Sequence, residues 1–290
     1  MIDNFNSKKI SRGLYLFWIY TLVVIAWGAW VRISHSGNGC GEHWPLCNGD
    51  VLPNLQDKKT LVEFSHRIMS GLYGLIVIGL FVAFRKSAAH PQQKKISAYL
   101  FVFMIIEALV GALLVKQNLV TVNDSVFRLV VMSLHQLNSF LLTGVTYLFY
   151  LSTQQVLNVR FTKLNLGFLI LAVSGAVASL AATLFPSTSL WEGILKDFSS
   201  DSHLFVRLRV IHPFLAVGLI SGVIYWLQTR AKSSVETSRL VINLFVAMLV
   251  GIITLVTLSP VWLKISHLLV AHFVWAAILK YQLLGQHKPV

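Results

Sequence analysis

Long apolar stretches separated by short polar segments are the main pattern along the 290-residue chain. A helix needs about 20 residues to cross a hydrocarbon layer about 30 Å thick, and a single segment in lipid must satisfy its own backbone hydrogen bonds. The pattern therefore predicts an all-α polytopic membrane protein with eight transmembrane helices, numbered here as spans one to eight. They cover residues 14–33, 61–84, 96–115, 129–151, 164–185, 204–227, 240–258 and 261–284.

The composition agrees with a membrane protein. Hydrophobic residues make up 56% of the chain and charged residues 12%, about half the charged share of a soluble domain. The net charge is +13, yet no basic patch lies in a folded polar region. We therefore expect no nucleic acid partner and attribute the positive charge to loops held beside an anionic membrane surface.

Lysines and arginines are divided unevenly between the two sets of loops, and basic residues favour the cytoplasmic side. With the N-terminus inside, thirteen lie in cytoplasmic segments and four in outer loops. Both termini are therefore predicted to be cytoplasmic, in a multi-pass protein of the cell membrane. The thirteen are Lys8, Lys9, Arg12, Arg85, Lys86, Lys94, Lys95, Arg160, Lys163, Arg230, Lys232, Arg239 and Lys288, and the four are Lys58, Lys59, Lys116 and Lys196. No small-residue cleavage site follows the basic head, so we expect span one to be retained.

The two cysteines of the chain, Cys40 and Cys47, lie in the outward segment 34–60, in the stretch HSGNGCGEHWPLCNGD. An oxidising compartment permits a disulfide there, and the nearby glycines supply the backbone freedom that a small ring needs. Two free thiols remain an alternative. A metal site that includes His43 is a further alternative, although a fourth ligand is not apparent.

Histidines within the membrane occur only in even-numbered spans. Span two holds His66, span four His135, span six His212, and span eight both His267 and His272. An ionisable side chain inside a membrane helix is costly and usually functional. The first four are the sixth, seventh, ninth and seventh residues of their spans, which places them about 8–12 Å from the outer end at 1.5 Å per residue.

A common depth in alternate spans predicts two tandem four-helix bundles, 1–151 and 152–290, related by a pseudo-two-fold axis along the membrane normal. Two histidines on different helices of such a bundle can bind a haem iron from its two sides. One alternative is that each histidine only hydrogen-bonds to a neighbouring helix. Another is zinc, for which no cysteine or carboxylate cluster completes a tetrahedral set.

Two acidic residues lie within the spans. Glu63 precedes His66 by three residues and shares its helical face, so beside a haem it could move protons or polarise a substrate group. Solvation at the outer interface is the alternative interpretation of Glu63. Glu107 could take part in a proton relay or form a hydrogen bond that packs two helices, and packing is the favoured interpretation. The second half has Arg209 three residues before His212. This asymmetry predicts one reactive site and one structural or electron-transfer site.

Three arginines near the outer ends are candidate contacts for haem propionates. Arginine can bind a carboxylate through two parallel hydrogen bonds. The alternative is that their side chains extend towards the membrane interface. The candidates are Arg67, Arg128 and Arg209.

Together these residues make the chain resemble the haem A synthase family. The resemblance extends from span one to span eight, and it is specific because the Gly-rich cysteine segment ending in Trp-Pro-Leu-Cys occurs together with a Glu-x-x-His-Arg motif. Neither feature would suffice alone. The matching stretches are GAWVRISHSGNGCGEHWPLCNG, VEFSHRIMSG, IIEALVGALLV, SVFRLVVMSLHQLNSFLL, AATLFPSTSL, LRVIHPFLAVG and VWLKISHLLVAHFVW.

The resemblance implies an oxidoreductase that converts a methyl group of haem O to a formyl group, through hydroxylated intermediates, and so provides haem A for cytochrome oxidase. It implies that the N-terminal half binds haem O as substrate through His66 and His135, beside the catalytic Glu63. It implies that the C-terminal half binds haem b through His212 and His267.

The family also links the pair matched by Cys40 and Cys47 to a disulfide and to catalysis. In span eight the family pattern His-Leu-Leu-x-Ala selects His267. His272 departs from the family, lies on a different helical face from His267, and is expected to pack between helices. Haem O synthase is a candidate partner. The electron donor and acceptor are not identified by the sequence, because it contains no dinucleotide-binding fingerprint and no further cysteine for an iron–sulfur cluster.

Two other functions would also use four membrane histidines. A quinol-linked di-haem b-type electron carrier would not need Glu63 beside one pair, nor two cysteines above the same half. A haem transporter or chaperone would have to release haem at either face, whereas all four histidines are predicted near the outer face.

Overall fold

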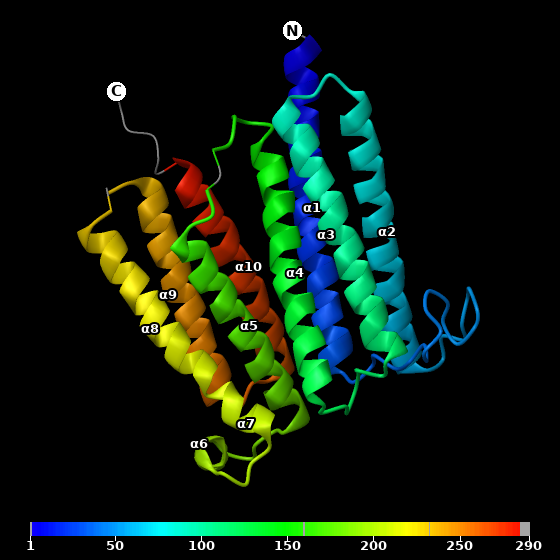
Figure 1. Cartoon of the computed structure of the whole chain (residues 1–290), viewed down its shortest axis with the longest axis vertical. Helices are drawn as coiled ribbons and strands as arrows, with labels where there is room; N and C mark the ends of the chain where they lie inside the picture. Colours follow the sequence, from blue (N-terminus) through cyan, green and yellow to red (C-terminus); the bar gives the residue numbers. More distant parts are fainter. Residues whose placement is uncertain (1, 159, 232, 285–290) are drawn as a thin grey trace. The chain divides into compact units, whose positions relative to one another are not determined.

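The computed structural model of the chain describes residues 2–158, 160–231 and 233–284, with side chains from Lys8 onward (Figure 1). Two residues considered above, Lys232 and Lys288, lie outside the described residues. The described part of the chain is all-α, and eight of its segments are long and apolar enough to cross a membrane. The all-α architecture with eight candidate spans is therefore confirmed.

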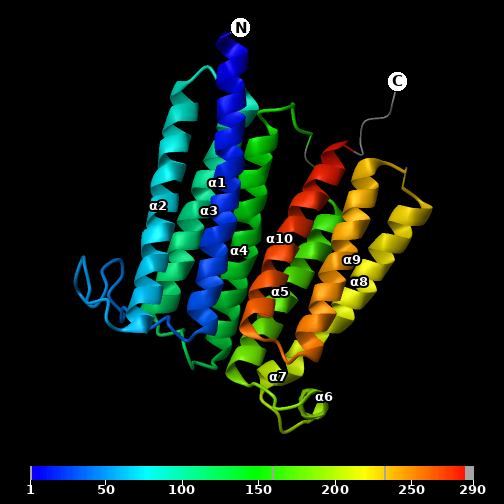
Figure 2. The same cartoon turned by 180° about the vertical axis from the view of Figure 1, so that it is seen from behind.

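The chain divides into two compact units, Met1–Asn158 and Val159–Val290. Unit 1 contains α1 (Ile2–Ile33), α2 (Lys58–Lys86), α3 (Pro91–Lys116) and α4 (Val126–Leu151). Each of these helices contacts the next one in the chain, and α4 also contacts α1. The four antiparallel helices therefore close into a bundle. Figure 2 shows this bundle from behind.

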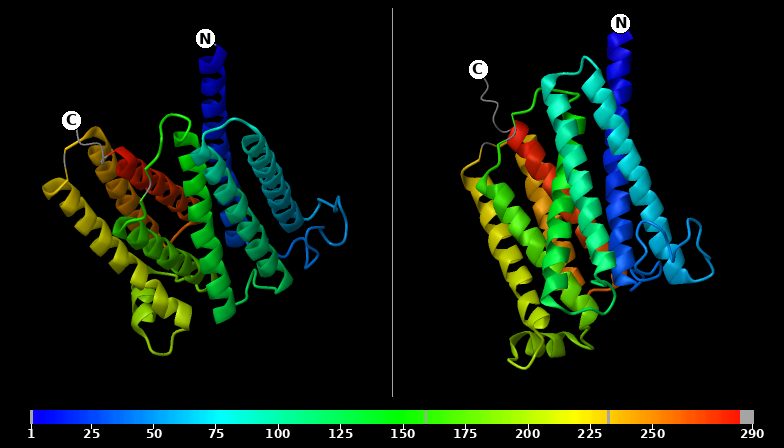
Figure 3. Two further views of the ribbon diagram at one scale, coloured as in Figure 1. Left: turned by 45° about the horizontal axis from the view of Figure 1, so that its top comes forward. Right: turned by 45° about the vertical axis from the view of Figure 1, so that its right-hand side comes forward.

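Unit 2 forms a second closed bundle. Around it, α5 contacts α8, α8 contacts α9, α9 contacts α10 and α10 returns to α5 (Figure 3). Span six consists of two helices, α7 and α8, which meet at Val210. The helices are α5 (Lys163–Leu184), α6 (Leu190–Phe198), α7 (Leu204–Arg209), α8 (Ile211–Thr229), α9 (Val235–Val256) and α10 (Val261–Leu284).

The short helix α6 lies in a connection that the sequence analysis treated as a loop. Its nine residues are too few to cross a membrane, so a search for long apolar runs does not detect it. Ser189 caps its first turn by accepting a hydrogen bond from the Glu192 backbone N–H. Hydrogen bonds from Lys196 and Thr188 lower the pKa of Glu192 to about 2, which keeps a negative charge at the helix N-terminus, where it is favourable.

Several helices begin before the apolar runs that predicted them, because polar residues cap their ends. Asp57 accepts a hydrogen bond of 2.8 Å from the Thr60 backbone N–H and starts α2 at Lys58. This hydrogen bond lowers the pKa of the Asp57 carboxyl. Ser125 starts α4 in the same way. Such caps satisfy N–H groups that have no partner within the helix.

The centre of unit 1 is an apolar cluster built by all four helices. The Phe17 and Tyr73 rings stack in it with centroids 4.9 Å apart. Lipid tails are as apolar as this core, so close packing rather than exclusion of water holds the helices together. The buried members are Leu14, Phe17, Val24, Tyr73, Val77, Leu100, Met104, Leu142 and Phe149.

Unit 2 has a buried polar contact between α5 and α10. The Gln282 amide nitrogen donates to Asn165 Oδ1 at 2.8 Å and to Thr162 Oγ1 at 2.7 Å, and the Asn165 amide nitrogen donates to Gln282 Oε1 at 3.1 Å. Asn165 Oδ1 also accepts from the Thr162 backbone N–H, which caps α5. One network of side chains therefore joins α5 to α10 and caps the N-terminus of α5.

The substitution Asn165→Ala should destabilise unit 2, because it leaves the Gln282 amide buried without its main partners. We expect a loss of about 1–2 kcal/mol in the free energy of unfolding in detergent. Thr229→Ala is the control, since Thr229 is exposed and bonds only within its own helix. Equal unfolding midpoints for the two variants would show that the network does not hold α5 to α10.

Candidate functional site

The Cys loop (residues 34–57) connects α1 to α2 and packs against the first turns of α2. Cys40 and Cys47 are fully buried and form a disulfide, with Cα atoms 4.3 Å apart. Their thiols are therefore neither free nor available to bind a metal together with His43. The loop also contacts the α3–α4 connection, where the Asn118 amide donates to the Glu42 carboxylate.

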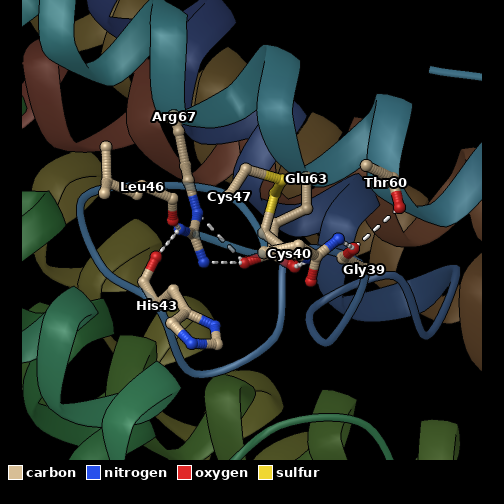
Figure 4. Close-up of polar contacts among 9 residues, drawn as sticks. Gly39, Cys40, His43, Leu46, Cys47, Thr60, Glu63 and Arg67 are labelled. Atoms are coloured by element: carbon tan, nitrogen blue, oxygen red, sulfur yellow. Dashed lines mark hydrogen bonds and ion pairs between the residues drawn. A yellow bond between two sulfur atoms is a disulfide. The ribbon is translucent and has the colours of Figure 1, made fainter. Parts of the chain in front are cut away.

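Glu63 lies in the second turn of α2, beneath the Cys loop, and is only 3% exposed. Its carboxylate accepts a hydrogen bond of 2.9 Å from the Cys40 backbone N–H at Oε2. At Oε1 it accepts hydrogen bonds from Arg67, at 2.5 Å from Nη2 and 3.2 Å from Nε (Figure 4). A buried carboxylate needs such partners, and one of them belongs to a half-cystine of the disulfide.

Arg67 extends from α2 to the Cys loop as well as to Glu63. Its Nη1 donates to the backbone carbonyl of His43 at 2.8 Å and to that of Leu46. Near the start of α2, the Thr60 hydroxyl donates to the Gly39 carbonyl at 2.7 Å. Helix α2 thus holds the loop through the loop's backbone atoms, as Figure 4 shows.

Close approach of the loop to α2 requires glycine at position 39. A Cβ atom built on Gly39 would overlap the backbone of Lys59 and Thr60. Backbone atoms at the start of a helix cannot move aside cheaply, so any side chain there would push the loop away from Glu63.

His66 on α2 and His135 on α4 belong to the same bundle. Each lies against a glycine of a neighbouring helix, Gly28 for His66 and Gly111 for His135. Neither Nδ1 atom makes a hydrogen bond to any described residue, although both are buried. Both imidazoles therefore have a buried Nδ1 atom that makes no hydrogen bond to the described part of unit 1.

Glu107 on α3 lies beside His135, with its Oε1 atom 3.5 Å from the imidazole Nδ1. The Asn138 side-chain amide donates to the other oxygen, Oε2, at 2.6 Å and to the Phe103 carbonyl at 2.9 Å. From the sequence, helix packing was the favoured role of Glu107, with a proton relay as the alternative. The hydrogen bond to Asn138 on α4 agrees, but the position beside His135 was missed because it depends on how α3 and α4 are aligned.

In unit 2 the His212 and His267 rings lie next to one another in an edge-to-face arrangement, with centroids 6.2 Å apart and planes 68° apart. The Ser174 hydroxyl lies 3.0 Å from His212 Nδ1, so a residue of α5 contacts this nitrogen of the imidazole. His267 Nδ1 is buried and makes no hydrogen bond to the described part of the chain. His272, on the same helix, is separately buried at 1% exposure.

The spacing of this pair fits a metal bound between two imidazoles. Two metal–nitrogen bonds of about 2 Å, with about 1.1 Å from each nitrogen to its ring centre, give about 6.2 Å between centroids when both nitrogens lie on the line that joins the ring centres. Across residues 2–158, 160–231 and 233–284, no group of three or more His, Cys, Asp or Glu side chains could hold a metal ion. A pair of histidines would suit a haem, whose porphyrin supplies four further nitrogens, better than zinc.

Arg128 and Arg209, the remaining candidate propionate contacts, also bind protein groups. Arg128 is 1% exposed and donates through Nη1 to the carbonyls of Thr121 at 2.9 Å and Asn123 at 2.5 Å. Arg209 pairs with Asp197 at 2.5 Å. Burial raises the pKa of Asp197 despite this ion pair. Contact between these arginines and a propionate stays a prediction.

Lys264 is a polar residue of span eight that the sequence analysis did not single out. It precedes His267 by three residues, the same spacing as Glu63 to His66. Its ammonium donates to Thr183 Oγ1 at 3.2 Å and lies 3.4 Å from the Ala182 carbonyl. Lys264 could have been identified from the sequence, because it is a charged residue within an apolar run.

Residues 11–279 match the family model named COX15-CtaA, described as cytochrome oxidase assembly protein. The chain therefore belongs to this family of haem A biogenesis proteins. Over 277 residues, covering 89% of this chain, it is 36% identical to a Thermus thermophilus protein named protoheme IX farnesyltransferase, and the match covers 45% of that protein. The chain thus spans less than half the length of this relative.

Shorter matches link the chain to proteins named heme A synthase. One from an Exiguobacterium species is 39% identical over 106 residues, covering 36% of this chain and 35% of that protein. One from Bacillus mycoides is 44% identical over 92 residues, covering 31% and 30% respectively.

Replacing Arg67 with alanine should release the Cys loop from α2. The change removes the donor to two loop carbonyls and the charged partner of buried Glu63, which should cost about 3 kcal/mol in local stability. Hydrogen–deuterium exchange over residues 38–50 should become faster. Lys58→Ala, an exposed change at the same junction, should leave exchange unchanged. Equal protection in both variants would contradict the anchoring role of Arg67.

Proposed function

We propose that this protein is a haem A synthase that oxidises a methyl group of haem O to a formyl group. The observation that carries this proposal is the buried Glu63 carboxylate, three residues from His66 and held by the backbone N–H of Cys40. Membership of the cytochrome oxidase assembly family supports it. The names of the partial relatives, heme A synthase, support it as well.

In unit 1, His66 and His135 would hold the substrate haem O from two helices, with Glu63 at the outer end of the same space. Glu63 would accept protons released as the methyl group is oxidised, since a carboxylate positioned beside a reacting group can act as a general base. Arg67 and the Cys40 N–H would keep this carboxylate in one orientation, and the Cys loop would exclude bulk water from it.

The conversion comprises two oxidations. In the first, the methyl group takes an oxygen atom from water and loses two electrons and two protons to become a hydroxymethyl group. In the second, a further water is added and two more electrons and protons leave. The resulting geminal diol loses water and gives the formyl group. In this proposal an oxidised membrane electron carrier takes the electrons, and Glu63 is the first acceptor of the protons.

Unit 2 would hold haem b between His212 and His267, and haem b, when bound, supplies one-electron transfer. Ser174 would orient His212 through Nδ1, as partners of metal-binding histidines do. Unit 2 has Arg209 where unit 1 has Glu63, so it lacks the equivalent proton acceptor. This difference supports a reactive site in unit 1 and an electron-transfer site in unit 2, within the proposed tandem arrangement of two bundles.

The proposal includes a membrane orientation with both termini in the cytoplasm and the Cys loop outside. The excess of lysine and arginine in the other loops supports this orientation. Haem O synthase is the proposed source of the substrate. The Thermus relative has a name that describes prenyl transfer to protohaem, which supports a functional link between the two activities.

The function can be tested by chromatography of haems extracted from cells that express this chain together with a haem O synthase. A new peak of haem A or hydroxylated haem O, absent without the chain, is the expected result. If a folded, haem-loaded protein gives only haem B and unchanged haem O, a di-haem membrane electron carrier is the better description.

Replacing Glu63 with glutamine should abolish product while bound haem is retained, because the amide keeps the shape of the side chain but cannot accept a proton. Extracted haems should contain unchanged haem O. His212→Ala is the companion variant and should instead lose the low-spin absorption of unit 2. Normal haem A formation by Glu63→Gln would rule out its catalytic role.

Replacing Glu107 with alanine should weaken haem binding in unit 1 by about tenfold, as expected when an outer-sphere partner of a metal-binding histidine is lost. Absorption and paramagnetic resonance spectra should change for one of two haems only. Glu192→Ala, on α6 of the other unit, serves as the control. An unchanged spectrum for Glu107→Ala would limit Glu107 to helix packing.

A further inference from the structure

We propose that a glycine on each odd-numbered span positions the haem-binding histidine of the following span, so that four Gly–His pairs set the ligand geometry. The inference rests on the haem ligation proposed above. It assigns a role in haem binding to Gly28, Gly175 and Gly251, with a weaker contribution from Gly111.

The four contacts follow one pattern along the chain. Gly28 on α1 meets His66 on α2, and Gly111 on α3 meets His135 on α4. Gly175 on α5 meets His212 on α8, and Gly251 on α9 meets His267 on α10. Each pair therefore joins an odd-numbered span to the next even-numbered one within a single unit.

The contacts are close and involve the same edge of each ring. A Cβ atom built on Gly28, Gly175 or Gly251 would lie 3.0 Å from the Cε1 atom of its histidine. At these three glycines, the three nearest atoms all belong to that one imidazole. Cε1 lies between the two ring nitrogens, so contact along this edge limits how far the ring can turn about its last bond.

Gly111 differs in degree. A Cβ atom there would lie 3.8 Å from His135 Cε1, which is an ordinary van der Waals separation. His135 has the Glu107 carboxylate 3.5 Å from its Nδ1 instead. One of the four imidazoles is therefore restrained by a carboxylate on the neighbouring helix and the other three by the helix backbone itself.

General helix packing does not account for these glycines. Small residues let membrane helices approach closely, but such contacts would bring backbone or apolar atoms nearest, and here imidazole atoms are nearest. Several other span glycines have nothing within 4 Å of a built Cβ, among them Gly13, Gly79 and Gly167. Glycine in a helix interior is also less favourable than alanine, so a glycine facing each ligand needs a specific reason.

An added methyl group at the three close positions would have to displace the ring by a few tenths of an ångström. The imidazole would turn from its preferred rotamer, and its Nε2 would no longer point where the opposite histidine requires. Because alanine stabilises a helix relative to glycine, weaker haem binding without loss of folding would separate ligand positioning from helix stability.

The experiment compares single alanine variants of the full-length protein in detergent, titrated with haem B. Gly28→Ala and Gly175→Ala are matched with Gly13→Ala and Gly167→Ala, which lie on the same two helices and have open space where the methyl group would be added. Folding is checked by thermal unfolding of the haem-free protein. Haem binding is measured by absorbance and by the low-spin g-values of the bound iron.

We expect Gly28→Ala and Gly175→Ala each to weaken one of two haem sites by about fivefold to tenfold and to shift its g-values. Gly111→Ala should have a smaller effect, and the two controls none. Binding by Gly28→Ala and Gly175→Ala equal to that of the controls would overturn the proposal. An effect of Gly111→Ala as large as that of Gly28→Ala would overturn the ring-edge explanation.

Failure of the haem ligation itself would look different. His66→Ala and His212→Ala are included for this reason. If the wild-type protein bound no haem B, or if these two variants bound it as the wild type does, the proposed function would fail whatever the glycine variants do.

Discussion

A membrane helix has no water to satisfy its polar groups, so each one must find a partner within the protein. This constraint explains the polar contacts of both units. Asn165 and Gln282 satisfy one another between α5 and α10, and Asn138 binds Glu107 between α3 and α4. Buried polar atoms that make no hydrogen bond to the described residues, among them Nδ1 of His66 and of His267, mark the histidines that we propose as haem ligands.

In each unit a charged side chain holds a loop against a helix, and the two charges are opposite. In unit 1, Glu63 accepts a backbone N–H from the loop before its helix. In unit 2, Arg209 donates to the Gly193 and Phe185 carbonyls and pairs with Asp197 in the corresponding connection. Each residue precedes the first histidine of its unit's proposed ligand pair by three positions. A residue three positions before a histidine therefore anchors a loop in each unit, but in unit 1 the anchor is a group that can accept a proton.

The sequence was sufficient to predict the features that depend on composition along one helix. Eight apolar runs predicted eight spans, and spacing alone placed Glu63 on the face of His66. Features that depend on contact between helices were not predictable. The contact between Glu107 and His135 and the contacts of the glycines depend on the relative height and rotation of two helices. The periodicity of residues along one helix does not reveal either quantity. Helix α6 was missed because short amphipathic segments give no hydropathy signal, and helix starts were misplaced because polar caps lie outside apolar windows.

The Cys loop has a consequence for how this protein can change in evolution. Apart from the disulfide, its contacts with Thr60, Glu63 and Arg67 use backbone atoms of the loop, namely the Cys40 N–H and the carbonyls of Gly39, His43 and Leu46. The hydrogen bonds at positions 43 and 46 therefore do not depend on which side chains stand there. Insertions and deletions cannot be tolerated in the same way, because each would move a carbonyl or the N–H away from α2. A change in the length of the loop, or at Gly39, should therefore disturb the Glu63 carboxylate more than a substitution at position 43 or 46.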